Sequence, residues 1–155
     1  MAETLADKNP PFFIVGCGRS GTTLLKSILS AHPELFVMPE TFFFKSVFPN
    51  VRRYGSEPWL ALSRWWLADA GITPNNLRSL VEARLAAGIS KECAVFGAIF
   101  DFHAALHPGA IVGEKTPGHV NHVAHIRKCF PNAKIIMIIR DPRAVVSSFR
   151  NVKVG

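Results

Sequence analysis

A glycine-rich turn directly after an apolar segment is the feature that most restricts the fold of this 155-residue chain. The run from Phe12 to Val15 is typical of a parallel strand that is buried on both faces. Gly16 and Gly21 follow with the spacing of a phosphate-binding loop, in which backbone N–H groups and a helix N-terminus hold an anion. A loop that splits ATP or GTP would carry lysine next, but this chain has Thr22 there. The loop is therefore expected to hold a phosphate-like group by a different chemistry.

Two further apolar segments, residues 110–115 and 134–140, predict buried strands. Each is followed by a Thr-Pro or Asp-Pro pair that is typical of a helix start. Strands that alternate with helices favour right-handed crossovers and a parallel sheet. We therefore predict an α/β fold of the P-loop-like type, with three layers (α/β/α) and a central parallel sheet. Its ligands should bind at the carboxyl ends of the strands.

The segment between the first two predicted strands is expected to be mostly helical. One helix should begin at Thr22 or Thr23 and end before Pro33, because the residue before proline avoids the helical region. Residues 39–56 are expected to form a loop with an aromatic cluster. Three helices should follow, over residues 58–71, 73–88 and 90–106.

Composition narrows the class of protein. The chain has 18 Lys and Arg against 11 Asp and Glu, a net charge of +7, which suits a polyanionic ligand. The basic residues are spread along the chain and do not alternate with aromatic residues, which disfavours a nucleic-acid partner. The longest aliphatic run, residues 135–139, is too short to cross a membrane. Residues 1–11 are expected to be a flexible lead-in rather than a secretory signal. Residues 12–155 are expected to form one domain.

The cysteines are odd in number and widely spaced. Cys17, Cys93 and Cys129 form no CxxC pair, which disfavours both a disulfide framework and a cysteine metal site. His103 and His107 are one helical turn apart, as are His119 and His122, but no acidic or cysteine partner is placed nearby. We therefore expect no metal site and a reducing, cytoplasmic location.

Polar residues follow each of the three predicted strands. Gly18 to Thr23 follow the first, Glu114 to Thr116 the second, and Arg140 to Arg143 the third, with Ser148 on the helix beyond. These cations and hydroxyls should meet at one edge of the sheet. The sequence therefore predicts a pocket for a ligand with more than one anionic group. Arg143 could contact that ligand or pair with a carboxylate on its own helix.

Four segments together resemble one enzyme family: RSGTT (19–23), PETFFF (39–44), GEKTPGH (113–119) and RDPRAVVSS (140–148). They are similar to the sulfotransferases that use 3′-phosphoadenosine-5′-phosphosulfate (PAPS), particularly a bacterial branch close to the tyrosylprotein and heparan sulfotransferases. The resemblance implies transfer of a sulfonate group from PAPS to a hydroxyl or amine acceptor, with release of adenosine 3′,5′-bisphosphate and without a metal. The acceptor, whether a small molecule, a carbohydrate or a peptide, stays open.

The same resemblance implies a role for each site residue. The 5′-phosphosulfate group would be held by the loop residues Gly18, Arg19, Ser20, Gly21, Thr22 and Thr23. Arg140 and Ser148 would hold the 3′-phosphate. Glu40 would act as the general base, and Lys115 would stabilise the bridging oxygen to the leaving phosphate. His119 is the alternative base, because the small-molecule branch uses a histidine shortly after its lysine, although here it does not stand in the expected place.

Two other functions stay open from the sequence. A P-loop kinase-like phosphotransferase would need lysine at position 22 and an acidic magnesium ligand, and neither is in place. A non-catalytic nucleotide-binding fragment could use the same loop. Family members are usually longer than a chain that stops at Gly155. We therefore expect a sheet that is incomplete at the C-terminus, with self-association or a missing C-terminal segment.

Overall fold

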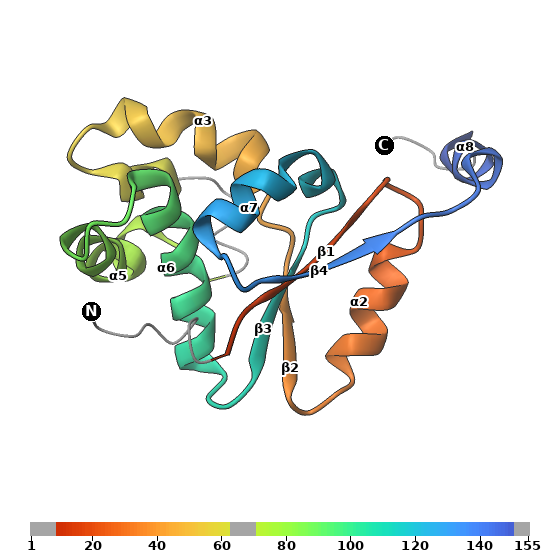
Figure 1. The fold of residues 1–155 in the computed structure, drawn as a ribbon, viewed down its shortest axis with the longest axis horizontal. Coiled ribbons are helices and arrows are strands. Elements are labelled where there is room, and N and C mark those ends of the chain that lie inside the picture. The colour runs from red at the N-terminus through yellow and green to blue at the C-terminus, as the bar shows by residue number, and fades with distance from the viewer. Residues whose placement is uncertain (1–8, 63–70, 151–155) are drawn as a thin grey trace.

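The computed structural model describes residues 9–62 and 71–150, which form a parallel four-stranded sheet with helices on both faces (Figure 1). The strand order is β2-β3-β1-β4. The strands are β1 (Phe12–Gly16), β2 (Leu35–Met38), β3 (Ile111–Lys115) and β4 (Lys134–Ile138). The predicted three-layer α/β/α class and its three predicted strands are confirmed.

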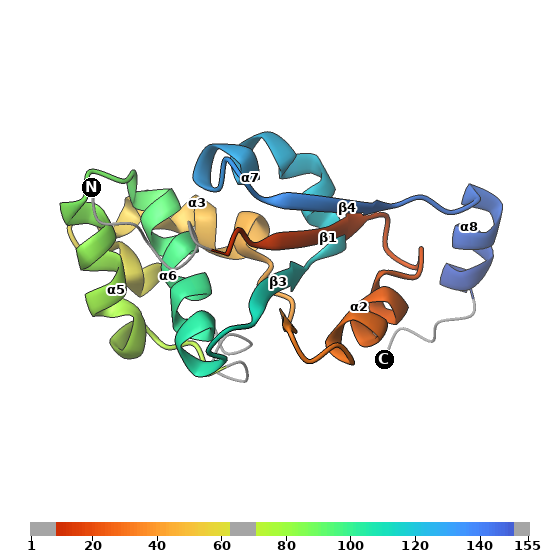
Figure 2. The ribbon, with the colours of Figure 1, turned by 60° about the horizontal axis from the view of Figure 1, so that its bottom comes forward.

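The two faces of the sheet follow from alternation along β1, which is buried throughout. Phe12 and Ile14 pack on the side of helix α2 (Thr22–Ser30). Phe13 and Val15 point to the larger core on the opposite face, with α6 (Lys91–Leu106) and α7 (Val123–Cys129). Figure 2 shows α2 and α7 on opposite sides of the strands.

Three predicted helix starts are confirmed by the hydrogen bonds or bounds of the helices. Thr73 caps α5 (Pro74–Ala86) in a capping box with Asn76, and Ser90 precedes α6. Asp141 accepts a hydrogen bond from the Arg143 backbone N–H at 2.8 Å at the start of α8 (Pro142–Arg150), which extends beyond the end of β4 (Figure 1). Proline is the first residue of α5 and of α8, where its fixed φ suits a helix start and its missing N–H costs no hydrogen bond.

A buried ion pair joins α5 to α6. The Arg84 guanidinium donates two hydrogen bonds to Asp101, at 2.6 and 2.8 Å, and both side chains are largely buried. The guanidinium lies directly over Gly97 of α6, where an added Cβ would collide with it. Gly97 therefore provides the space in which this pair forms.

The prediction of a loop over residues 39–56 is wrong in part. The chain there forms a π-helical turn (η1, Phe43–Val47), a short α-helix (α3, Phe48–Val51) and a 3₁₀ turn (η2, Arg52–Tyr54). Phe43, Phe44, Val47 and Val51 are buried at nearly helical spacing, and the Phe43 ring stacks on Phe96 of α6 at 4.1 Å. Burial of this aromatic face stabilises the helical turns.

Strand β2 was not predicted. β2 has only four residues and is held by pairing with β3, a contact between distant parts of the sequence. The helix predicted to start at the Thr116-Pro117 pair begins there as a 3₁₀ turn, η4 (Pro117–His122), and continues as α7. The predicted helix from Pro58 is described only as a 3₁₀ turn, η3 (Pro58–Leu62). Its further extent, with Trp65 and Trp66, lies outside the described residues, as do residues 1–8 of the expected lead-in.

The expectation that the cysteines are unpaired is wrong for two of them. Cys93 at the start of α6 and Cys129 at the end of α7 form a disulfide with a Cα–Cα distance of 4.9 Å, whereas Cys17 is free and exposed. The two helices lie side by side because both cover the same face of the sheet. Cytoplasmic location stays a prediction, but unpaired cysteines no longer support it.

Apolar side chains are exposed around β4, which has β1 as its only strand partner among the described residues. They are Met137, Ile139, Val146 and Phe149.

No described helix is long and apolar enough to cross a membrane.

Loss of the disulfide should lower the free energy of unfolding by roughly 3 to 4 kcal/mol, because it closes a loop of 36 residues in the unfolded chain. The test is urea denaturation of a Cys93→Ala, Cys129→Ala double variant beside the parent protein. Cys17→Ala is the control, because Cys17 is free, and the midpoint of its urea transition should equal that of the parent protein. Equal stability of parent and double variant would mean that the two cysteines are not linked in the folded protein.

Candidate functional site

The loop after β1 has the conformation of an anion-binding turn. Gly21 has a left-handed backbone (φ 102°) and caps α2 without a side chain, so no side-chain cap occupies the N–H groups of the first turn. Ser20 Oγ donates to the Cys17 carbonyl at 2.5 Å and closes the loop on itself. Arg19 also has a positive φ, 65°. The predicted residues Gly18 to Thr23 therefore form one compact turn at a helix N-terminus.

Gly16 has a specific steric role where β1 enters this loop. Its φ is 150°, and an added Cβ would lie 2.5 Å from the carbonyl oxygen of Ile138 on β4. Only glycine allows the two backbones to approach this closely.

The loop contacts the third strand end. Arg140 Nη1 donates to the Arg19 carbonyl oxygen at 2.9 Å, and Arg19 Nε donates to Ser148 Oγ at 3.2 Å. The Phe149 ring lies against Gly18. The structure thus brings the predicted residues Arg140 and Ser148 to the predicted phosphate loop, although they are more than 110 residues apart in the sequence.

The second strand end supplies a lysine between the loop and Glu40. Lys115 Nζ donates to Thr23 Oγ1 at 3.4 Å and forms an ion pair with the Glu40 carboxylate. The Lys115 side chain is 6% exposed and that of Glu40 is 29% exposed. The lysine therefore lies beneath a carboxylate that solvent can reach.

Glu114, next to Lys115, is fully buried and accepts hydrogen bonds from Thr41, Thr116 and His119. Burial alone would raise the pKa of the Glu114 carboxyl. The charge of His119 and these hydrogen bonds outweigh burial and hold the pKa below its ordinary value. Nothing in the sequence pattern distinguished Glu114 from its neighbours in GEKT.

His119 lies on the far side of β3 from the lysine. It is 2% exposed, and its Nδ1 is 3.1 Å from Glu114 Oε2, whereas Lys115 pairs with Glu40. Phe44 and Phe96 pack edge-on to its ring. The alternative base is therefore shielded from an incoming acceptor.

Arg143 was predicted either to contact the ligand or to pair with a carboxylate of its own helix, and the structure shows the ion pair. Its guanidinium pairs with Asp141 at 2.7 to 3.2 Å and is exposed. Within residues 9–62 and 71–150, no group of three or more His, Cys, Asp or Glu side chains could hold a metal ion.

Comparison with known proteins agrees with this geometry. A sequence model of the sulfotransferase family matches residues 10–154. The chain belongs to the sulfotransferase family. It is 32% identical to protein-tyrosine sulfotransferase 1 of Mus musculus and 30% identical to protein-tyrosine sulfotransferase A of Caenorhabditis elegans, each over 94% of this chain. The matches cover 35% and 34% of those relatives, so the chain spans about a third of their length.

A solved structure has the same fold. The sulfotransferase domain from the Synechococcus PCC 7002 olefin synthase is similar with a TM-score of 0.56 and 26% identity. The similarity covers 92% of this chain and 52% of that domain. The predicted family is confirmed, whereas the roles of individual site residues stay predictions.

Lys26 is a further cation of the candidate site that the motifs did not reveal. Burial, and then the positive charge of Lys115, lower the pKa of Lys26. It follows Thr23 by three residues on α2, and Thr23 contacts Lys115, so Lys26 lies on the helix face toward the site. That spacing from the loop threonine is the signal that could have identified it.

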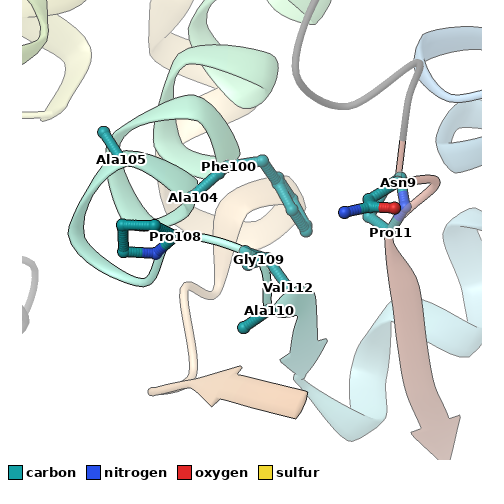
Figure 3. Close-up of a pocket in the computed structure, with 9 residues that line it drawn as sticks. All are labelled: Asn9, Pro11, Phe100, Ala104, Ala105, Pro108, Gly109, Ala110 and Val112. Atoms are coloured by element: carbon teal, nitrogen blue, oxygen red, sulfur yellow. The ribbon is translucent and has the colours of Figure 1, made fainter. Parts of the chain in front are cut away.

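Two hollows differ in their relation to the candidate site. One of about 520 Å³ lies beside the phosphate loop, between Cys17, Asn121 and Arg140. Another of about 270 Å³ lies at the amino ends of the strands, between the end of α6 and the chain entering β1 (Figure 3). Its lining is mostly apolar and includes none of the predicted site residues, so only the first hollow adjoins the candidate site.

Gly16→Ala should lower the free energy of unfolding by about 1 to 3 kcal/mol, since the Cβ requires either a strained backbone or a shift of β4. Urea denaturation measures the loss. Gly118→Ala is a matched control, because Gly118 lines the same hollow but an added Cβ there meets no atom within 4 Å. If the two variants are equally stable, the close approach of Gly16 to Ile138 does not occur.

Proposed function

We propose that this chain carries the donor-binding and proton-accepting part of a PAPS-dependent sulfotransferase. The observation that supports this most is the position of Lys115, which contacts both the phosphate-loop residue Thr23 and the carboxylate of Glu40. One ammonium group thus connects the expected donor site with the expected acceptor site. An in-line transfer needs the acceptor oxygen and the leaving phosphate on opposite sides of the transferred sulfonate group, with a positive charge close to the leaving oxygen.

Donor recognition rests on the phosphate loop and the start of α8. The first-turn N–H groups of α2 are available because Gly21 offers no side-chain cap, and they suit the 5′-phosphosulfate group. Arg140 and Ser148, which both contact Arg19, suit the additional 3′-phosphate. When bound, PAPS supplies the activated sulfonate group.

Glu40 and Lys115 would act in succession. Glu40, partly open to solvent, accepts the proton of the acceptor hydroxyl. Protonation removes the negative charge that Lys115 pairs with in the free protein. The ammonium then stabilises the negative charge that grows on the bridging oxygen of the leaving phosphate, which is where its effect on the rate is largest.

We infer a hydroxyl acceptor, and a peptide tyrosine as the first one to test. The names of the matched relatives in Mus musculus and Caenorhabditis elegans state that they act on protein tyrosine. Carbohydrates and small alcohols belong in the same panel of acceptors, as do amines.

Arg140→Ala should weaken binding of adenosine 3′,5′-bisphosphate by roughly 10- to 100-fold, because a charge-assisted hydrogen bond to phosphate contributes ~1.5 to 3 kcal/mol. Affinity for adenosine 5′-phosphosulfate, which lacks the 3′-phosphate, should change little. Calorimetry with both nucleotides measures the difference. Arg143→Ala is the matched control, since Arg143 pairs with Asp141 and should leave both affinities intact.

Two results would oppose the donor assignment. One is equal affinity of the parent protein for the two nucleotides. The other is tighter binding of ATP with magnesium, which would favour the kinase-like alternative.

Glu40→Gln should lower turnover by roughly 10²- to 10⁴-fold, the usual contribution of a positioned base, with nucleotide affinity unchanged. Lys115→Ala should likewise reduce turnover more than nucleotide binding. Initial rates with PAPS and a tyrosine peptide, measured beside adenosine 3′,5′-bisphosphate affinity, separate the two effects. Parental turnover in Glu40→Gln would exclude Glu40 as the base.

A further inference from the structure

Glu114 and Lys115 are consecutive residues of β3, so their side chains point to opposite faces of the strand. Lys115 faces Thr23 and Glu40. Glu114 faces the other way and has no exposed surface. A buried carboxylate is costly unless its oxygens are paired, so its partners must account for its presence.

All described partners of Glu114 lie on two segments of the site. Its Oε1 accepts hydrogen bonds from Thr41 N at 3.2 Å, from Thr41 Oγ1 at 3.0 Å and from Thr116 Oγ1. Its Oε2 lies 3.1 Å from His119 Nδ1. Both oxygens are thus engaged, and two of the four contacts go to the residue that directly follows Glu40.

The same two segments are therefore joined twice. On one side of β3, Lys115 pairs with Glu40; on the other, Glu114 holds Thr41. Two connections on opposite sides fix both the distance and the rotation of the Glu40 segment relative to the strand end, which one ion pair cannot do.

The backbone of this segment requires such support. Phe42 has a left-handed backbone with φ 47°, which is unfavourable for a bulky residue. Its N–H contacts Thr116 Oγ1 at 3.4 Å, and that hydroxyl in turn donates to Glu114. An unfavourable conformation persists only where surrounding contacts hold it.

We propose that Glu114 is a positioning residue of the transfer reaction: through Thr41 it aims the Glu40 carboxylate at the acceptor beside Lys115. This inference rests on the proposed function and adds a residue that contacts neither donor nor acceptor. Its loss should lower the catalytic rate while leaving the binding of donor and acceptor intact.

Thr41 offers the sharpest test. Thr41→Val keeps the side-chain volume and the backbone N–H but removes the hydroxyl that donates to Glu114. We expect kcat to fall by roughly 10- to 100-fold, the effect of a small misplacement of a reacting group, without change in acceptor KM or in affinity for adenosine 3′,5′-bisphosphate. Thr41→Ser, which restores the hydroxyl, should recover most of the lost turnover. Parental kcat in Thr41→Val would overturn the proposal.

A measurement independent of turnover tests the contact itself. In Glu114→Gln the acceptor loses its charge, so amide hydrogen exchange at residue 41 should become at least about 10-fold faster, while exchange in β1 stays as in the parent. Arg84→Met is the control for general destabilisation, because it breaks the distant pair with Asp101. It should leave both kcat per folded molecule and the relative exchange at residue 41 unchanged. Unchanged exchange at residue 41 in Glu114→Gln would overturn the inference.

The two readouts separate this inference from the proposed function. A parent protein that transfers no sulfonate from PAPS would refute the proposed function, whereas the exchange data would still report whether Glu114 holds Thr41. A parent protein that transfers sulfonate, together with a Thr41→Val variant of equal kcat, would refute the positioning role alone.

Discussion

Burial of β1 between β3 and β4 is the constraint on which the rest of the molecule depends. Every residue of this strand is buried, and its alternate side chains form the centres of two cores on opposite faces of the sheet. Because β1 pairs with a strand on each side, the position at which the following turn begins is fixed. The close packing around β1 therefore also holds the start of the phosphate loop in place, at Gly16, where the loop meets the β4 backbone.

The candidate site follows from the parallel direction of the strands. β1, β3 and β4 all end at the same edge, so the phosphate loop, Lys115 and Arg140 come together although none is close to the others in sequence. Arg19 and Phe42 are the non-glycine residues with positive φ in the described part of the chain, and both lie in loops of this site. Unfavourable backbone conformations thus occur in the loops that orient the side chains of the candidate site.

The sequence was informative where a local pattern decides the structure. Apolar runs identified β1, β3 and β4, and the Thr-Pro and Asp-Pro pairs marked helix starts. The sequence was not informative where contacts between distant parts of the chain determine the structure. β2 is stabilised by its pairing with β3, and the Cys93–Cys129 disulfide forms because two helices cover one face of the sheet. The motifs pointed to Glu40 and Lys115 as a pair through family resemblance. The structure adds their contact, and also the hydrogen bonds from Thr41 to Glu114, which lies 73 residues further along the chain.

The neighbouring opposite charges of β3 make this strand intolerant of any change in its length. A single residue inserted or deleted before Glu114 would exchange the two side chains between the faces of the sheet. The carboxylate would then face the phosphate loop and repel the anionic donor that we propose. The ammonium would enter a core lined by Phe44 and Phe96. Homologous chains should therefore vary in length on the amino-terminal side of Ile111, in the turn after α6, rather than within the strand itself.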